Sequence, residues 1–212
     1  MAASTGVWAS EGTARADDTV VWLQPLGDAL PDADVALVKQ ALVALYALDV
    51  RLLPRAPLPA AAWYPPRRRW RAEKILASLL AERDQAHRKG FVLGLTSADI
   101  STTKGAYADW GVLGLGEIGD GSDGTAAVIS TFRCHKKATG DEHARQRLAK
   151  VAVHELGHTL GLYHCPNRGC LMEDAGGQVV TTDREHDLCP ACRARLAAAG
   201  RKLPSPVVLP WP

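Results

Sequence analysis

The sequence predicts a mixed α/β (α+β) domain in which a twisted, mixed five-stranded sheet is flanked by helices. Three observations lead to this fold class. Short apolar stretches alternate with helical stretches over the first half of the chain, two more apolar stretches follow, and a long helix comes after them. The resulting order, β-α-β-α-β-β-β-α, is typical of a mixed sheet with helices on its faces.

The first half of the chain supplies two strands and a helix between them. Residues 19–26 (TVVWLQPL) and 49–54 (DVRLLP) are short and rich in residues that favour strands. The helix is expected to begin at Asp32, because apolar residues follow it at helical spacing. These residues are Val35, Val38, Leu42 and Leu45. The stretch 54–70 is rich in Pro and Arg, and we expect a loop there.

The second half begins with a helix over residues 70–84 and contains a long helix from about 141 to 160. The strands expected between these helices are 90–96, 111–117 and 126–132. Thr139 and Glu142 have the spacing of a capping box, in which each side chain bonds the other's backbone at the start of the long helix. A final helix is expected over about 183–199.

We expect a single domain over residues 18–200, because a chain of 212 residues can bury one hydrophobic core. Its upper lobe would span 18–161, and a small irregular C-terminal lobe with one helix would span 162–200. Residues 1–17 are small and polar and predict a mobile N-terminal tail. The Pro-rich stretch 201–212 cannot form a helix and predicts a second tail.

Composition favours a cytoplasmic protein, and we expect a monomer. The net charge of +2 implies no broad attraction to nucleic acid or to a membrane surface. No apolar run reaches the roughly 18–20 residues that a membrane-spanning helix needs. The first residues lack the basic and apolar regions of a signal peptide. In a reducing compartment, the five cysteines are expected to be thiols or metal ligands rather than disulfides.

The stretch HELGHTLGLYHC (154–165) carries the chemistry. His154 and His158 are four residues apart on a helix, so they share one face and both reach one Zn²⁺. Glu155 stands beside the first histidine, close enough to contact a water on the metal. Gly161 can end the helix in the left-handed conformation, which lets His164 approach the same metal from another side. The alternative is an amphipathic helix with incidental histidines. The pattern fixes five positions in eleven, however, so chance is a poor explanation for it.

This pattern, HExxHxxGxxH, resembles the metzincin metallopeptidases. The longer stretch HELGHTLGLYHCPNRGCLM, followed by LCPAC, is similar to the archaemetzincin family. The resemblance implies a metzincin-like fold in which the three histidines bind a catalytic zinc. It also implies that Glu155 acts as general base and acid, and that Met172 lies in a tight turn beneath the metal.

The same resemblance points to a second zinc. Four cysteines supply two pairs of thiolates, which would close a tetrahedral structural site. They are Cys165, Cys170, Cys189 and Cys192. We therefore expect two Zn²⁺ per chain, with buried thiols or two disulfides as the alternative. Cys134 is left over and is expected to be inert and partly buried. The remaining histidines lack ligand spacing and are expected at the surface. They are His87, His135, His143 and His186.

These features predict a zinc metallopeptidase, an endopeptidase or an aminopeptidase, that acts on peptides or small proteins. The resemblance implies that substrate binds along an antiparallel edge strand, for which we expect residues 111–117 with Gly111, Leu113 and Leu115 at the substrate. Tyr163 either steadies the oxyanion or only packs. The alternative function is a zinc-stabilised binding or regulatory module with an occluded or weakly active site. The presence of Glu155 favours the enzyme.

Overall fold

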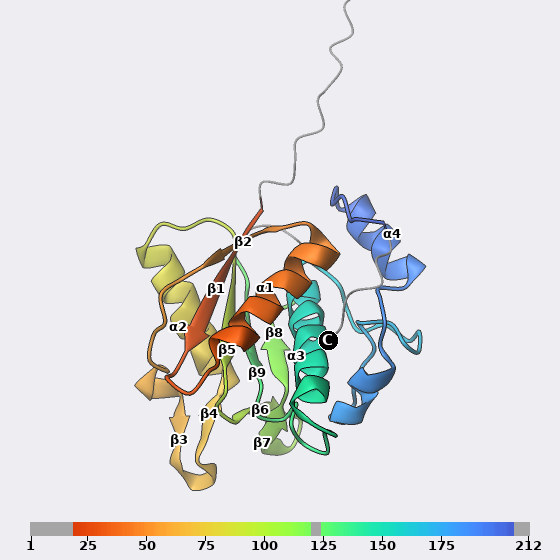
Figure 1. Ribbon diagram of the computed structural model, residues 1–212. Coiled ribbons are helices and arrows are strands. Elements are labelled where there is room, and N and C mark those ends of the chain that lie inside the picture. The colour runs from red at the N-terminus through yellow and green to blue at the C-terminus, as the bar shows by residue number, and fades with distance from the viewer. Residues whose placement is uncertain (1–18, 120–123, 206–212) are drawn as a thin grey trace, which may run out of the picture.

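The computed structural model describes residues 19–119 and 124–205 and is built around a mixed five-stranded sheet (Figure 1). Its strands are β1 (Val20–Leu26), β2 (Asp49–Leu52), β5 (Phe91–Thr96), β8 (Gly114–Gly116) and β9 (Ala126–Ser130). Their order is β2-β1-β5-β9-β8. The first four are parallel, and β8 pairs antiparallel with β9 at one edge. The predicted fold class is confirmed.

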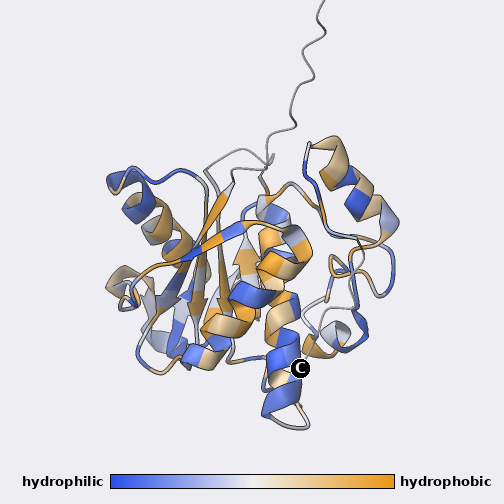
Figure 2. Ribbon diagram, turned by 45° about the horizontal axis from the view of Figure 1, so that its top comes forward, coloured by the Kyte–Doolittle hydropathy of each residue, from blue (hydrophilic) through white to orange (hydrophobic). Residues whose placement is uncertain are grey.

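Three helices cover the two faces of this sheet. Helices α1 (Asp32–Tyr46) and α3 (Asp141–Thr159) lie on one face, and α2 (Ala72–Gln85) lies on the other. The central strands are buried on both faces, so their successive residues enter the two core clusters in turn. In β9, Ala127 and Ile129 face α1 and α3, whereas Ala126 and Val128 face α2. The hydrophobic colour in Figure 2 accordingly gathers on the central strands.

A second sheet, absent from the sequence-based prediction, stands beside the first. Its strands are β3 (Trp63–Tyr64), β4 (Arg69–Arg71), β6 (Ile100–Lys104) and β7 (Tyr107–Val112), in the order β3-β4-β6-β7. The predicted loop 54–70 therefore contains two short strands, along with the 3-10 turns η1 (Ala60–Ala62) and η2 (Pro65–Arg67). These two strands escaped prediction because a strand of two or three residues is too short to show a periodic pattern. They are also held in the second sheet by ion pairs between residues that are far apart in the sequence. Arg69, for example, bridges Asp99 at 2.7 Å and Asp109 at 2.8 Å.

The predicted edge strand 111–117 is wrong as a single unit. Gly111 and Val112 end β7 and pair with β6 in the second sheet. Only Gly114–Gly116 form the edge strand β8 of the main sheet. Leu113 is the junction, and its carbonyl oxygen accepts a hydrogen bond from Ser130 N at 2.8 Å. The chain passes from one sheet to the other at this residue, which no local pattern of apolar residues reveals.

The two ends of helix α3 differ from each other in how well the sequence predicted them. The predicted capping box is wrong, because the helix begins at Asp141, Gly140 is its N-cap and no side chain caps it. Thr139 instead contacts His143 Nδ1 through its hydroxyl at 3.1 Å. At the other end the chain leaves the helix at Gly161, whose φ is 91°. Gly161 N donates to His158 O at 3.0 Å and Leu162 N to Gly157 O at 2.9 Å, which is the Schellman pattern.

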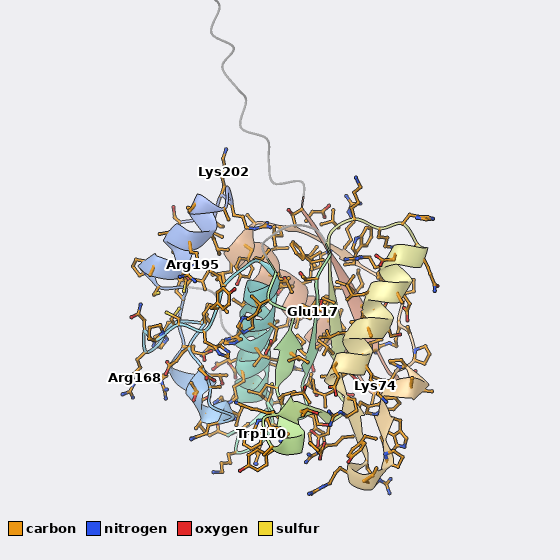
Figure 3. The ribbon with its side chains drawn as sticks, turned by 180° about the vertical axis from the view of Figure 1, so that it is seen from behind. Lys74, Trp110, Glu117, Arg168, Arg195 and Lys202 are labelled. Carbon is orange, nitrogen blue, oxygen red and sulfur yellow. The ribbon has the colours of Figure 1, made fainter. Side chains whose placement is uncertain are left out.

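The C-terminal lobe contains the 3-10 helix η3 (Val179–Arg184) and helix α4 (Pro190–Ala198). The predicted helix over 183–199 is thus shorter, because Pro190 occupies its first turn and fixes its start. Figure 3 shows Arg168 and Arg195 in this lobe, on the opposite side of the molecule from Lys74 of α2.

The predicted tails are only partly within the described residues. The tail over 1–17 lies outside them, as do residues 206–212 of the second tail. Residues 201–204 pack on the domain: the guanidinium of Arg201 lies 5.7 Å from the centre of the Phe91 ring, and Arg193 Nη1 donates to Pro204 O at 2.9 Å. The part of the chain that is described has no helix with both the length and the apolar character needed to cross a bilayer.

Candidate active site

Helix α3 and the turn after it bring three imidazoles together. His154 Nδ1 lies 2.8 Å from Leu171 O, and His158 Nδ1 lies 2.7 Å from Leu162 O. Each Nδ1 therefore carries the hydrogen, and each Nε2 keeps its lone pair. The two Nε2 atoms are 3.1 Å apart. The His164 ring centre is 5.3 Å from that of His154 and 4.9 Å from that of His158.

The donor set of these histidines fits Zn²⁺. Two nitrogens bound at ~2.0–2.1 Å in a tetrahedron would be about 3.3 Å apart, close to the observed separation of 3.1 Å. Burial lowers the pKa of His154 to about 3, and burial also lowers the pKa of His158. Both rings are therefore neutral at pH 7, which is the form that binds a metal.

Glu155 is buried beside the histidines and against strand β8. Burial raises the pKa of its carboxyl to about 8. A Cβ at Gly114 would lie 2.5 Å from Glu155 Cγ, and a Cβ at Gly116 would lie 2.5 Å from Glu155 O. The edge strand can approach helix α3 only because both positions are glycine. Sequence reasoning missed this role, although two glycines in a short strand are the signal of such a close approach.

The floor of the site is formed by Met172 and by Tyr46, a residue that the sequence did not single out. Met172 is fully buried, and its Sδ lies 2.5 Å from where a Cβ on Gly157 would stand. Tyr46 donates from its hydroxyl to Val153 O at 2.9 Å, so it holds α1 against α3 under the histidines. Gly157 thus lets both side chains pack beneath the helix between His154 and His158.

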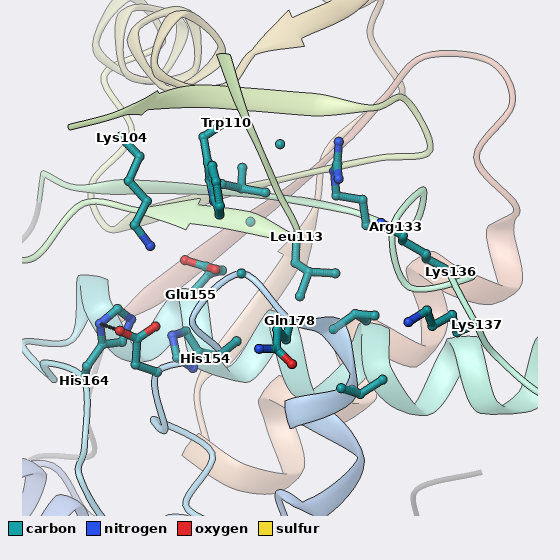
Figure 4. A pocket seen from close by; sticks show the side chains of 18 residues that line it. Lys104, Trp110, Leu113, Arg133, Lys136, Lys137, His154, Glu155, His164 and Gln178 are labelled. Carbon is teal, nitrogen blue, oxygen red and sulfur yellow. Dashed lines mark ion pairs between the residues drawn. The ribbon is translucent and has the colours of Figure 1, made fainter. Parts of the chain in front are cut away.

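A cleft of about 290 Å³ opens over His154 and Glu155 (Figure 4). Of the residues predicted at the substrate, Gly111 and Leu113 line it. Leu115 does not, because in β8 its side chain points to the opposite face and packs with the cluster beneath α2. Tyr163 is 58% exposed and is not among the residues that line the cleft, so neither predicted role is evident for it.

The four predicted cysteines lie together in the C-terminal lobe. Their sulfurs are all within 4.8 Å of one another, with Cys165 to Cys189 at 3.6 Å and Cys170 to Cys192 at 3.7 Å. A disulfide needs about 2.05 Å, so these are free thiols. Four sulfurs bound at ~2.3 Å in a tetrahedron would be about 3.8 Å apart, so the cluster fits Zn²⁺. Backbone N–H groups of Met172 and Cys189 point to Cys170 Sγ at 3.5 and 3.4 Å, which favours a thiolate there.

Comparison with known proteins shows the family to which this chain belongs. The sequence profile described as Peptidase family M54 matches residues 46–198, which include both side-chain groups. The chain belongs to peptidase family M54. An archaemetzincin from Haloquadratum walsbyi is 30% identical over 184 residues, which cover 84% of this chain and 99% of the relative. The archaemetzincin resemblance and the prediction of a metallopeptidase are thus confirmed at the level of the family.

Two solved structures share the fold of this M54 member. The crystal structure of the archaemetzincin from Archaeoglobus fulgidus, complexed with malonate, has a TM-score of 0.69 and 30% identity, and covers 84% of this chain and 99% of its own. That of the archaemetzincin from Methanopyrus kandleri has a TM-score of 0.68 and 28% identity, and covers 87% of this chain and 96% of its own.

The remaining cysteine and histidines lie outside both side-chain groups of the M54 domain. Cys134 is fully buried rather than partly buried, and burial raises the pKa of its thiol to about 12, which fits an inert residue. His87, His135 and His186 are exposed, as expected. His143 differs from the prediction, because it is half-buried and its Nε2 lies 2.8 Å from Asp183 Oδ1. Asp183 belongs to η3, so this contact joins the two lobes. The spacing of the histidines in the sequence could not predict such a contact.

Proposed function

We propose that this M54 metallopeptidase hydrolyses peptide bonds with Zn²⁺ held by His154, His158 and His164 and with Glu155 as general base. The observation that carries the proposal is the position of the Glu155 carboxyl. It is buried on α3 beside His154, and it faces the cleft at the point where Gly114 leaves room for it.

The chemistry divides between the metal and Glu155. Bound Zn²⁺ supplies a Lewis acid that polarises the scissile carbonyl and lowers the pKa of water. Glu155 takes the proton from the attacking water, since a carboxylate in a dry pocket is a stronger base than one in solvent. Glu155 then delivers this proton to the amine nitrogen as the C–N bond breaks. The Nδ1–H bonds to Leu171 O and Leu162 O keep the two helical imidazoles oriented meanwhile.

Substrate would bind by strand addition to β8. Among the strands that the structure describes, β8 pairs with β9 alone, so its other edge has no strand partner and can accept a peptide backbone, although the Gly116 N–H there contacts the Glu155 carboxyl. Antiparallel pairing is the more stable arrangement per residue. Since β8 runs from Gly114 to Gly116, a substrate in this orientation places the residues that follow its scissile bond toward Leu113.

The cysteine cluster would hold a second, structural Zn²⁺. Cys165 directly follows His164, and Cys170 lies two residues before Met172. A closed thiolate site at these residues would therefore fix the third histidine and the methionine beneath the helix. Free thiols also favour a reducing cytoplasmic location. The monomeric state stays a prediction.

The test compares wild type with Glu155→Gln on a mixed peptide library, with cleavage read by mass spectrometry and zinc measured in both. We expect cleavage by the wild type only, with equal zinc content. Glu142→Gln is the matched control, since Glu142 is exposed on the same helix. Equal cleavage by wild type and Glu155→Gln would refute the general-base role. Absence of cleavage in both would favour the binding module. Acetylated and free N-termini in the library separate an endopeptidase from an aminopeptidase.

A further inference from the structure

The cleft carries an excess of positive charge. Its lining includes the cations Lys104, Arg133, Lys136 and Lys137 but only two carboxylates, Glu155 and Asp174. The cations are divided between its two ends. Figure 4 shows Lys104 on the side of His164, and the other three beyond Leu113 on the far side of Glu155.

Two of these cations already have partners within the protein. Arg133 Nη2 lies 2.8 Å from Asp99 Oδ1, and its guanidinium packs against the backbone of β7 at Gly111. The Lys104 ammonium lies 5.6 Å from the centre of the Trp110 ring. Lys136 and Lys137 differ: both are exposed, and within residues 19–119 and 124–205 neither forms an ion pair. Their charge is available to a ligand in the cleft.

The turn that carries these two lysines is held rigidly. Arg147 is almost fully buried on α3, and its Nη1 donates to Cys134 O at 3.1 Å and to Lys136 O at 2.9 Å. The same guanidinium bonds both carboxylate oxygens of Asp183 in η3, at 2.7 and 2.8 Å. Lys137 is in the left-handed region, with φ of 59°, a backbone conformation that non-glycine residues uncommonly adopt. The fold therefore fixes Lys136 and Lys137 at the rim of the cleft.

We infer that Lys136 and Lys137 form a subsite for a carboxylate on the C-terminal side of the scissile bond. The carboxylate is either an Asp or Glu side chain or the free C-terminus of a short peptide. This inference rests on the proposed function, because antiparallel addition to β8 is what directs the C-terminal part of a substrate past Leu113 toward these lysines.

The rise of an extended chain and the shape of a lysine side chain are consistent with this subsite. An extended peptide advances about 3.3 Å per residue, so each residue that follows the scissile bond carries the substrate further past Leu113 toward the lysines. Lysine stems extend along apolar surface while their ammonium groups stay in solvent, where a carboxylate can approach them. An ion pair between exposed groups is weak, so the two lysines together should give a preference of roughly three- to tenfold.

Binding to the Glu155→Gln protein tests the subsite without requiring hydrolysis. The probes are alanine-rich hexapeptides with Glu or Gln near the C-terminus, each made as a free acid and as an amide. We expect the Glu peptides or the free acids to bind three- to tenfold more tightly, and the preference to fade in high salt. Comparison of the Glu amide with the Gln acid tells a side-chain carboxylate from a terminal one. Matched peptides with Glu near an acetylated N-terminus should gain nothing.

Variants then assign the preference to the lysines. In the zinc-loaded Glu155→Gln background, Lys136→Gln with Lys137→Gln should abolish the preference and leave binding of the Gln amide unchanged. Lys137→Glu should reverse it. Lys74→Ala is the control, because Lys74 lies on α2 outside the cleft (Figure 3). Equal affinity for all probes, or a preference that survives the double substitution, overturns the inference. If the wild type cleaves neutral peptides but shows no preference for a carboxylate, the subsite is refuted and the proposed hydrolysis stands. If the lysine-dependent preference is observed but the wild type cleaves nothing, the proposed hydrolysis is refuted and the subsite stands.

Discussion

The side chain of Glu155 occupies the space that a side chain on Gly114 would fill. A Cβ at Gly114 would stand 2.5 Å from Glu155 Cγ and 2.7 Å from Oε1. Contacts this short force one of the two groups to move. Because β8 is fixed by its pairing with β9, we expect the Glu155 carboxyl to move.

Gly114→Ala should therefore lower activity without removing zinc. A displacement of about 1 Å in a catalytic group costs roughly 100-fold in rate, so kcat should fall by one to two orders of magnitude. Peptide hydrolysis and zinc content, measured on the same preparation, check this. Gly140→Ala is the matched control, because a Cβ at Gly140 meets nothing within 4 Å. Full activity in Gly114→Ala would mean that Glu155 does not need its observed position.

The two proposed metal sites use different ligands, so their occupancies should separate. His158→Ala removes one of three imidazoles from the histidine site and leaves the sulfurs untouched. We expect zinc content to fall from about two to about one per chain, because loss of a ligand opens the catalytic site while the thiolate site stays closed. Metal analysis by mass spectrometry checks this, with His186→Ala as control because His186 is exposed and outside both groups. Two zincs retained in His158→Ala would refute the histidine site.

The main sheet was predictable because its central strands β5 and β9 are short, fully buried and mostly apolar runs, and the helices around it show helical periodicity. Helix α1 begins at Asp32 as predicted, and Val35, Val38, Leu42 and Leu45 are all buried. The second sheet was not predictable, since its pairing depends on contacts distant in sequence. Arg69 finds Asp99 and Asp109 only after the chain has folded.

The candidate site was predictable for a different reason. Its ligand spacing is local: His154 and His158 share a helix, and Gly161 must end it for His164 to return. Residues that act through packing left no comparable signal. Tyr46 reaches Val153 O from another helix, 107 positions earlier in the chain. The edge strand was misplaced because Leu113 divides one apolar run between two sheets.

The ion pair between Asp183 and Arg147 should make the C-terminal lobe sensitive to acid. The hydrogen bond from Arg147, together with a smaller contribution from the contact with His143, lowers the pKa of Asp183 from 3.8 to about 2. The folded pKa is below the unfolded value, so the ionised pair stabilises the fold above about pH 4. That contribution is lost as pH falls through about 2.

Asp183→Asn should lower stability at pH 7, because the buried guanidinium of Arg147 loses its counter-charge. An unpaired buried polar group costs roughly 1–3 kcal/mol. The difference in unfolding free energy from wild type should shrink between pH 4 and pH 2, and denaturant unfolding across this range measures it. Asp187→Asn is the control, since Asp187 pairs with Arg193 instead. A difference that stays constant down to pH 2 would refute the assignment.

The cysteine cluster allows a final prediction, because a zinc site and a pair of disulfides respond oppositely to reductant. Cys170→Ser should lose one zinc, destabilise the C-terminal lobe and lower activity, since His164 and Met172 lose their anchor. Cys134→Ser, which removes a thiol remote from the cluster, should keep both zincs. Strong reductant without chelator should leave the wild type folded and active. After denaturation in chelator, five titratable thiols per chain support the zinc site, whereas one thiol would establish the disulfides and overturn it.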